Sequence, residues 1–353
     1  MYGLYGRQKL AVLAAVAGSL LVASCSAALP FDSESDLVLG DAAPASSPSS
    51  ANSSGDIIDF SAITDLENVG DVVAARTGDS LHIGTTDELR AGNESIVKLS
   101  APCGEMTSTA DAFLVACGTS VYKVLALDPA NPSLIPVDVN FPVTAATELP
   151  SGELFVASDS STDVVMYANG KKQDTITVEE PVSELLSVEN HNGKDSVIRT
   201  NREASTIQNI DWSNSRAGGR LRVGLGLGQT AVGDNGTIVV SDTTGKRLAI
   251  YTSDSVVRLH QLAPVEGSPW GVDWDSYRNL VWVTTTDNNA LQGFDISTGV
   301  PELVSTIDTV AQAEHIRALP SGEIVVGSNS SDGLQILKTT DINTAQNHRP
   351  SSK

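Results

Sequence analysis

The sequence predicts an all-β protein folded as a seven-bladed β-propeller, with a strand from the N-terminal side closing the last blade. Aromatic residues make up 5% and charged residues 18% of the 353 residues, a mixture typical of short strands joined by many turns. An apolar run that breaks into Ser, Thr, Asp and Asn recurs along the chain. Two copies share the lead-in Leu-Pro-Ser-Gly-Glu, at Leu149–Glu153 and Leu319–Glu323.

The spacing of these runs predicts the number of blades. Seven copies begin at Leu81, Phe113, Leu154, Val197, Ile238, Val281 and Ile324. The intervals between them are 32, 41, 43, 41, 43 and 43 residues. A period of about 40–45 residues with four short strands per unit is typical of propeller blades. The short first interval predicts a first blade without a complete outer strand. No linker interrupts the repeats after Asp56, so one propeller over residues 56–338 is favoured over two domains.

The amino terminus has the pattern of an export signal. Arg7 and Lys9 precede an uncharged apolar run from Leu10 to Val22, which is shorter than a membrane span. Small residues then lead into Cys25, as in a bacterial lipobox, which predicts a signal peptide over residues 1–24 and a diacylglyceryl group on Cys25. Such an anchor would hold the protein at the extracytoplasmic face of the plasma membrane. The alternative is ordinary cleavage near Ala27, with Cys25 lost.

The segments at the two ends of the propeller are polar. Residues 25–55 are rich in Ser, Ala, Pro and Asp, and we expect them to form a flexible tether. Residues 339–353 are expected to be a disordered tail, because the seventh unit ends after its third strand near Lys338. Ile57–Ile63 is apolar and precedes the first unit, so it is predicted to supply the missing outer strand of the last blade.

The two cysteines of the predicted propeller are expected to form a disulfide. The repeat places the turn between the first and second strands of the second unit at Ala110, midway between Cys103 and Cys117. These cysteines would then face each other across antiparallel strands. An exported pair is more consistent with a disulfide than with a zinc site, which needs three or four ligands.

The blade pattern resembles NHL and YVTN/YncE-like propeller repeats, and Pro269–Asp275 is similar to their first-strand motif. A closer resemblance is to LppL-type propeller lipoproteins of mycobacteria and their relatives. It is carried by the lipobox around Cys25 and by Ala112–Gly118, Leu221–Gly236 and Gly293–Pro301. The resemblance implies a surface-anchored propeller and supplies no catalytic residues. The pair Cys103 and Cys117 is not expected throughout that family.

A ligand surface is predicted where the innermost strands begin, because these strands surround the central channel of a propeller. The candidate residues are Trp270 and Asp273 of the sixth unit and Glu314, His315 and Arg317 of the seventh. The alternative is structural: Trp270 and Trp274 pack between blades, and Glu314 and Arg317 form a surface ion pair.

Composition and motifs argue against several other functions. The formal charge of −21 disfavours nucleic acid as a partner. No paired-histidine metal motif and no nucleophile beside an evident base occur, so neither a metal, a cofactor nor a catalytic residue is predicted. Asp and Asn residues after the recurring strands could bind calcium, but they are more typical of side chains that cap their own turns.

The sequence therefore favours a lipid-anchored, non-enzymatic propeller that binds or organises an envelope protein or polymer. The alternative is a metal-dependent hydrolase or lactonase-like enzyme with its site at the channel. An assembly factor for a membrane complex is a third hypothesis.

Overall fold

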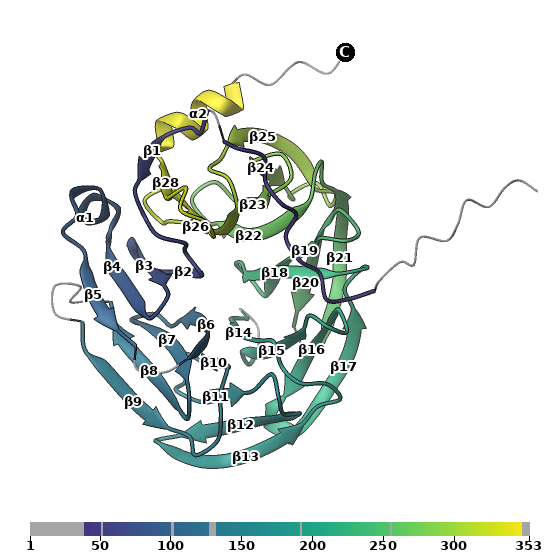
Figure 1. Ribbon diagram of the computed structural model, residues 1–353. Coiled ribbons are helices and arrows are strands. Elements are labelled where there is room, and N and C mark those ends of the chain that lie inside the picture. The colour runs from purple at the N-terminus through teal and green to yellow at the C-terminus, as the bar shows by residue number, and fades with distance from the viewer. Residues whose placement is uncertain are drawn as a thin grey trace, which may run out of the picture. The chain divides into compact units, whose positions relative to one another are not determined.

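Seven four-stranded antiparallel sheets form a ring around a central channel in the computed structural model, which confirms the predicted propeller (Figure 1). The structure describes residues 39–50, 52–99, 102–126, 132–190, 193–254 and 256–347. The predicted signal peptide and Cys25 lie outside the described residues. No helix among the described residues is long and apolar enough to cross a membrane.

Each blade runs from an inner strand A at the channel to an outer strand D. Blade 1 contains β2 (Asp65–Val69), β3 (Val72–Thr77), β4 (Ser80–Thr85) and β5 (Ser95–Lys98). Blade 2 contains β6 (Cys103–Ser108), β7 (Ala112–Cys117), β8 (Ser120–Leu125) and β9 (Leu134–Asp138). Blade 3 contains β10 (Ala145–Glu148), β11 (Leu154–Ala157), β12 (Asp163–Ala168) and β13 (Lys171–Thr177). Blade 4 contains β14 (Glu184–Val188), β15 (Ser196–Asn201), β16 (Thr206–Asp211) and β17 (Arg216–Arg222).

The remaining blades follow the same order. Blade 5 contains β18 (Leu227–Val232), β19 (Thr237–Asp242), β20 (Arg247–Ser253) and β21 (Val257–Pro264). Blade 6 contains β22 (Pro269–Asp275), β23 (Leu280–Thr285), β24 (Ala290–Asp295) and β25 (Glu302–Asp308). Blade 7 contains β26 (Ala313–Ala318), β27 (Ile324–Ser328), β28 (Leu334–Leu337) and β1 (Asp56–Ile58). Three helices complete the described part of the chain: α1 (Thr86–Ala91), η1 (Trp212–Asn214) and α2 (Thr339–Asn347).

The burial of each strand follows from its place in a blade. The B strands β7, β11, β19, β23 and β27 are apolar and almost entirely buried, because neighbouring blades cover both of their faces. The D strands β13 and β21 are largely exposed. Seven hydrophobic clusters form the core, one between each pair of adjacent blades. The core is therefore divided among the blade interfaces, and the polar channel remains at the centre.

The ring closes as predicted. Strand β1 pairs antiparallel with β28, with Asp56 opposite Ile336 and Ile58 opposite Leu334. The strand is shorter than the predicted segment Ile57–Ile63, because Ile63 leaves the sheet and enters the hydrophobic cluster between blades 7 and 1. The N-terminal side of the chain thus completes the last blade and also fills the seam beside it.

The first blade differs from the prediction. It has all four strands, and Leu81 lies in its third strand, β4, instead of its second. Its second strand is β3, which begins at Val72, 41 residues before Phe113. The prediction was wrong because Leu-His-Ile-Gly-Thr-Thr resembles the recurring run more closely than Val-Val-Ala-Ala-Arg-Thr does. The short interval of 32 residues reflects this shift by one strand.

Residues 39–50 and 52–55, expected to belong to a flexible tether, instead lie along the propeller; we call them the strap (Figure 1). Gly40 N donates to Leu225 O at 2.7 Å, and Asp41 N donates to Arg202 O at 2.9 Å. Gly40 has φ +83°, and an added Cβ would lie 1.8 Å from Glu203 O, so this close approach requires glycine. The low apolar content of the strap concealed an interaction made by backbone and hydroxyl groups.

The strap continues across blades 6 and 7 to β1. Ser47 Oγ donates to Thr286 O at 2.6 Å and accepts from Gln312 N at 2.8 Å. Asn289 Nδ2 donates to Pro48 O at 2.8 Å, and Ser54 N donates to Asp308 O at 3.1 Å. All these partners lie at one end of the strands.

The expected disordered tail also contains regular structure. Helix α2 occupies Thr339–Asn347, and Ile342 on this helix is fully buried in the cluster between blades 6 and 7. One apolar side chain in a polar segment is a weak sequence signal, so the helix could not be predicted from composition.

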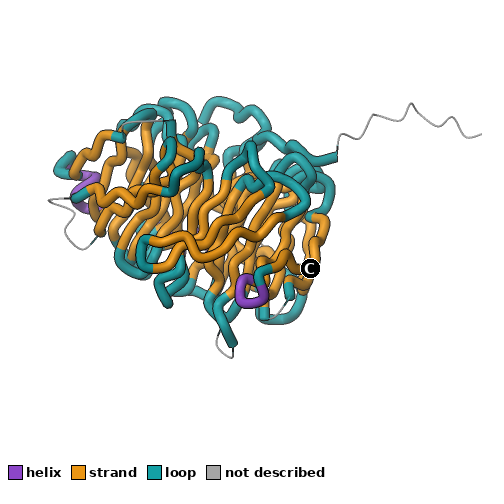
Figure 2. The backbone as a smooth tube through the Cα atoms, turned by 90° about the horizontal axis from the view of Figure 1, so that it is seen from below, coloured by secondary structure: helices purple, strands orange, loops and turns teal. Residues whose placement is uncertain are grey.

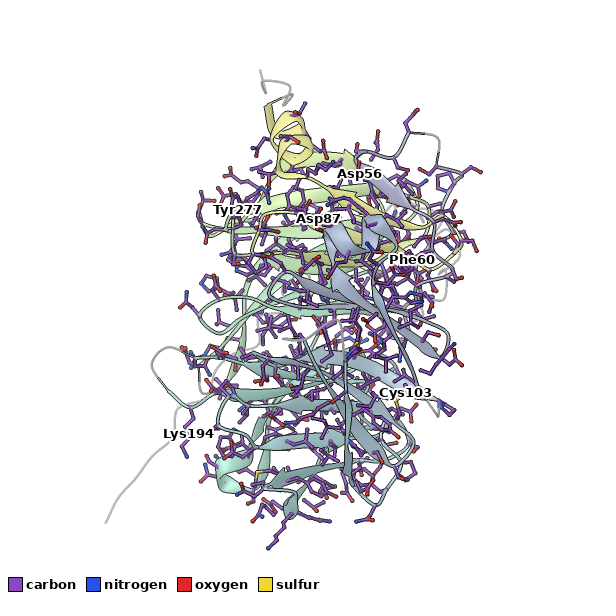
Figure 3. The ribbon with its side chains drawn as sticks, turned by 90° about the vertical axis from the view of Figure 1, so that its left-hand side faces the viewer. Asp56, Phe60, Asp87, Cys103, Lys194 and Tyr277 are labelled. Carbon is purple, nitrogen blue, oxygen red and sulfur yellow. A yellow bond between two sulfur atoms is a disulfide. The ribbon has the colours of Figure 1, made fainter. Side chains whose placement is uncertain are left out.

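The strands run between two faces that carry the loops (Figure 2). The strap face carries the D–A and B–C connections, and the open face carries the A–B and C–D connections. Figure 3 shows the ring from its side, with Cys103 toward the strap face and Lys194 and Tyr277 on the open face. The predicted disulfide between Cys103 and Cys117 is present; the two residues are opposite each other in β6 and β7, with a Cα–Cα distance of 4.0 Å.

Candidate functional site

A cavity of about 580 Å³ occupies the channel and opens on the open face. The inner strands of all seven blades line it, through Glu67, Thr107, Thr147, Glu184, Thr230, Asp273 and Arg317. Its mouth is formed by residues of the A–B connections, among them Glu189, Asp234, Ser276 and Pro320. This volume falls within the range of about 300–1,000 Å³ that is usual for small-molecule sites.

Two contacts between non-adjacent blades cross the channel nearer the strap face; we call them the plug. Glu105 of blade 2 forms an ion pair of 2.5 Å with Arg202 of blade 4. Gln229 of blade 5 and His315 of blade 7 are hydrogen bonded at 3.3 Å between Nε2 and Nδ1. None of these four residues lines the cavity. The plug and the mouth of the cavity therefore lie toward opposite faces of the ring.

Irregularities in the inner strands produce the plug. The strand register shifts between Cys103 and Met106 in β6 and between Leu227 and Thr230 in β18. A β-bulge inserts an extra residue and re-aims a side chain, here those of Glu105 and Gln229. Gly104 permits the bulge in β6, since an added Cβ would lie 1.8 Å from Thr144 O of the next blade.

Two further carboxylates near the channel are paired with arginine. Arg317 binds Glu67 through both carboxylate oxygens, at 2.8 Å from Nε and 3.0 Å from Nη2. Arg76 lies 3.3 Å from Asp65, whose Oδ2 also accepts from Met106 N at 2.6 Å. Burial nevertheless raises the pKa of Asp65 to about 6, although the charge of Arg76 opposes this shift.

Glu184 and Asp273 are the most perturbed carboxyl groups of the cavity. Burial raises the pKa of Glu184 to about 8, and the charge of Glu105 adds to the shift. Burial raises the pKa of Asp273 to about 7, against the charge of Arg317. Thr230 Oγ1 donates to Glu184, and Ala318 N donates to Asp273 Oδ2 at 2.6 Å. Groups that titrate near neutral pH inside a cavity are candidates for binding or acid–base chemistry.

The structure separates the five candidate residues from the sequence into two groups. Asp273 and Arg317 both line the cavity. Trp270 is 8% exposed and lies away from the cavity, where its ring would meet a Cβ added at Gly228 of blade 5. Glu314 accepts from Asn329 Nδ2 at 2.9 Å within blade 7.

The fifth candidate, His315, belongs to the plug. Burial, together with the nearby positive charges of Arg317, Arg76 and Arg202, lowers the pKa of His315 to about 3. The imidazole is therefore neutral at physiological pH and serves as a hydrogen-bonding group at the inner end of the channel.

The sequence did not identify Glu67, Thr147 or Glu184 as candidates. Glu67 and Thr147 lie on inner strands at the depth of Asp273 and Arg317, whereas Glu184 begins its strand and lies nearer the strap face. A residue-by-residue alignment of the inner strands would have found them, but these strands are short and the bulges disrupt the alignment. The recurring B strands predicted the period of the repeat, but they did not show which residues of the inner strands lie at the same depth.

The Asp residues after the B strands mainly hold loops together. Asp242 Oδ1 accepts from the backbone N of Leu225, Gly226 and Gly245, each at 3.0 Å. Asp287 Oδ1 accepts from Ser268 N at 2.6 Å. Among the residues that the structure describes, no group of three or more His, Cys, Asp and Glu side chains could hold a metal ion.

Comparisons with known proteins identify the fold. No protein-family model matches the chain, and no curated protein matches it. Among solved structures it is similar to streptogramin B lyase, with TM-score 0.61 and 9% identity over 81% of this chain and 96% of that chain. It is also similar to the WD40 β-propeller domain of Doa1, with TM-score 0.56 and 12% identity over 82% of this chain and 95% of that one.

A third similar structure is a chain of the mitotic checkpoint complex, with TM-score 0.61 and 12% identity over 92% of this chain and 98% of that one. Sequence identities of 9–12% show the propeller fold alone. The function must therefore be argued from the channel.

Proposed function

We propose that this protein is a lipid-anchored, non-enzymatic binding module of the extracytoplasmic face of the bacterial plasma membrane, and that the channel cavity is its ligand site. The observation that carries the proposal is the cavity itself, which inner strands of all seven blades line and which opens on one face. A rigid ring positions groups from seven blades around one ligand without a conformational change.

The location is supported by the sequence and by one structural feature. The basic and apolar segment before Cys25 is the pattern of an exported lipoprotein. The disulfide between Cys103 and Cys117 suits an oxidising compartment. At that location, an envelope protein or polymer is the expected partner.

The anchor is tested with Cys25→Ala in the full-length chain. We expect the variant to lose labelling by a fatty-acid analogue and to move from the membrane fraction to the medium. A variant that stays in the membrane fraction without the label would contradict the lipid anchor. A wild-type protein that takes up no label would contradict it as well.

The ligand site is tested by filling the cavity. Ser187 lines the cavity and is half-buried, so Ser187→Trp should occupy part of it; Ser213→Trp on exposed η1 is the matched control. Crosslinking in native membranes followed by mass spectrometry should recover a ligand or partner with wild type and the control. Equal recovery with Ser187→Trp would remove the cavity from the binding site.

The second candidate is a hydrolase or lactonase-like enzyme at the same cavity. The observation in its favour is the pair Glu184 and Asp273, whose pKa values of about 8 and about 7 suit acid–base catalysis near neutral pH. Hydrolysis of a panel of lactones should then fall at least about a hundredfold in Asp273→Asn. Hydrolysis that is absent in wild type or unchanged in the variant would exclude this candidate.

A further inference from the structure

The charges around the channel do not balance. Three arginines form ion pairs with carboxylates: Arg76 with Asp65, Arg202 with Glu105, and Arg317 with Glu67. Glu184 and Asp273 are left over, since neither makes a direct ion pair within the described part of the chain. Both are at least nine-tenths buried, at 9% and 8% exposure. Buried carboxylates are costly unless a positive charge or a proton compensates them.

The cavity concentrates this excess negative charge. Among the described residues, the charged ones that line it are the acids Glu67, Glu184, Glu189, Asp234 and Asp273 and the base Arg317. Because Glu67 neutralises Arg317 through two hydrogen bonds, no lining base within the described residues compensates the other four acids. Burial favours the protonated forms of Glu184 and Asp273, and a bound cation would favour their ionised forms. A cleft lined by one sign of charge attracts ligands of the opposite sign.

A second kind of observation also points to a ligand. Trp274 lines the cavity, and its buried Nε1 has no hydrogen-bond partner within the described residues. A buried polar group without a partner is uncommon and is usually satisfied by a ligand or water. Thr147, which is 1% exposed, lines the cavity as well.

We propose that the cavity binds a small organic cation carrying a primary ammonium group, such as an amino sugar or a diamine, and that Glu184 and Asp273 are its counter-ions. This proposal rests on the proposed function of the cavity and specifies its ligand class. An ammonium group has three donors and no acceptor. It therefore matches a carboxylate that has no other cation, and the hydroxyl oxygens of an amino sugar can accept a hydrogen bond from Trp274 Nε1.

A metal ion fits the same charge less well. Divalent cations need several converging oxygen ligands, and no group of three or more His, Cys, Asp and Glu side chains suited to a metal occurs in the described ranges. Glu184 and Asp273 come from blades 4 and 6, and Thr147 comes from blade 3. This spread of groups around a 580 Å³ cavity suits a ligand of several atoms.

The test is titration calorimetry on the purified propeller with two matched pairs of probes. Glucosamine and putrescine should bind, whereas N-acetylglucosamine and 1,4-butanediol, which lack the positive charge, should bind at least about tenfold more weakly. Glu184→Gln and Asp273→Asn should each weaken binding of the cations by about tenfold or more. Glu302→Gln removes one exposed charge on β25 and should leave binding unchanged.

Binding of neither cation, or equal binding of a cation and its neutral partner, would overturn the proposal. Binding of Ca²⁺ with no binding of either amine would overturn it in favour of a metal. Circular dichroism tests whether each variant is folded. If a variant is unfolded, the comparison of charged and neutral probes on the wild-type protein still tests the proposal. If native membranes yield a neutral or anionic ligand that Ser187→Trp excludes, the proposed binding function holds and the ligand class is wrong.

Discussion

Glu184 shows how one residue can serve binding at the expense of stability. Its carboxyl group is surrounded by Thr200, Thr230 and the inner strands of neighbouring blades, with no arginine in direct contact among the described residues. The pKa of Glu184 in the folded chain, about 8, exceeds its usual value of 4.5. The protonated form is therefore favoured by folding, and its contribution to stability is lost as the pH rises through about 8.

This shift makes stability depend on pH in a defined window. Between pH 8 and pH 6.5, Glu184 and Asp273 take up protons in the folded state, whereas His315, with its pKa lowered to about 3, does not. The free energy of unfolding should rise by on the order of 1 kcal/mol as the pH is lowered across this range. Urea denaturation at the two pH values measures this change in the free energy of unfolding. The change should be smaller in Glu184→Gln than in the wild-type protein. An unchanged rise in that variant would assign the effect to other groups.

Asp242 provides a second prediction at the scale of one residue. Its Oδ1 is the acceptor for three backbone N–H groups in two loops of blade 5, and the residue is 1% exposed. Asp242→Ala should lower the free energy of unfolding by about 2–4 kcal/mol, because buried donors lose their acceptor. Asp242→Asn retains an oxygen acceptor and should cost less. Equal losses in urea denaturation would show that the charge, and not the hydrogen bonds, matters.

At the scale of the element, α1 links the first blade to the last. Arg90 on α1 donates to Glu323 in blade 7 at 2.6 Å and to Asp56 in β1 at 3.0 Å. Arg90→Ala should lower the free energy of unfolding by about 1–3 kcal/mol, since the partly buried carboxylate of Glu323 loses its ion-pair partner. Asp87→Ala removes only an exposed partner of Arg90 and should cost less than about 1 kcal/mol. If chemical denaturation shows similar losses of unfolding free energy for Arg90→Ala and Asp87→Ala, Arg90 does not stabilise the contact between blades 1 and 7.

Blade 2 carries a different constraint, the disulfide across β6 and β7. It closes a loop of 14 residues and lies beside Gly104 and Glu105 of the bulge. Replacing both Cys103 and Cys117 by Ala should cost about 2–4 kcal/mol. Thermal unfolding with and without a reductant measures the effect, and the reductant should shift the midpoint of wild type only. A shift of similar size in the double variant would show that the reductant acts elsewhere.

At the scale of the whole molecule, the N-terminal segment has two separable roles. A chain beginning at Asn52 keeps β1 and loses most of the strap, whereas a chain beginning at Asp59 loses both. We expect the Asp59 chain to unfold at a markedly lower temperature and to self-associate, because the edge of β28 is then exposed. The Asn52 chain should remain monomeric. Size-exclusion chromatography measures the association state of the two chains, and calorimetry measures their unfolding temperatures. Identical results for the two chains would show that β1 is not needed to close the ring.

Much of this architecture could be read from local patterns. The apolar B strands recur because every blade is covered on both sides, so Phe113 and Ile324 stand in equivalent surroundings although they are far apart in the chain. The same period located Cys103 opposite Cys117. In the first blade the pattern misled, since Leu81 in strand C has neighbours as apolar as those of a B strand.

The sequence alone determined the number of blades, the closing strand and the disulfide, because these depend on short-range alternation of apolar and turn residues and on its period. Only the tertiary structure decided the site. The pairing of Glu67 with Arg317, the plug formed by Glu105 and Arg202, and the contacts of the strap join residues that lie far apart in the chain. The burial that raises the pKa of Glu184 and Asp273 exists only when all seven inner strands surround the channel.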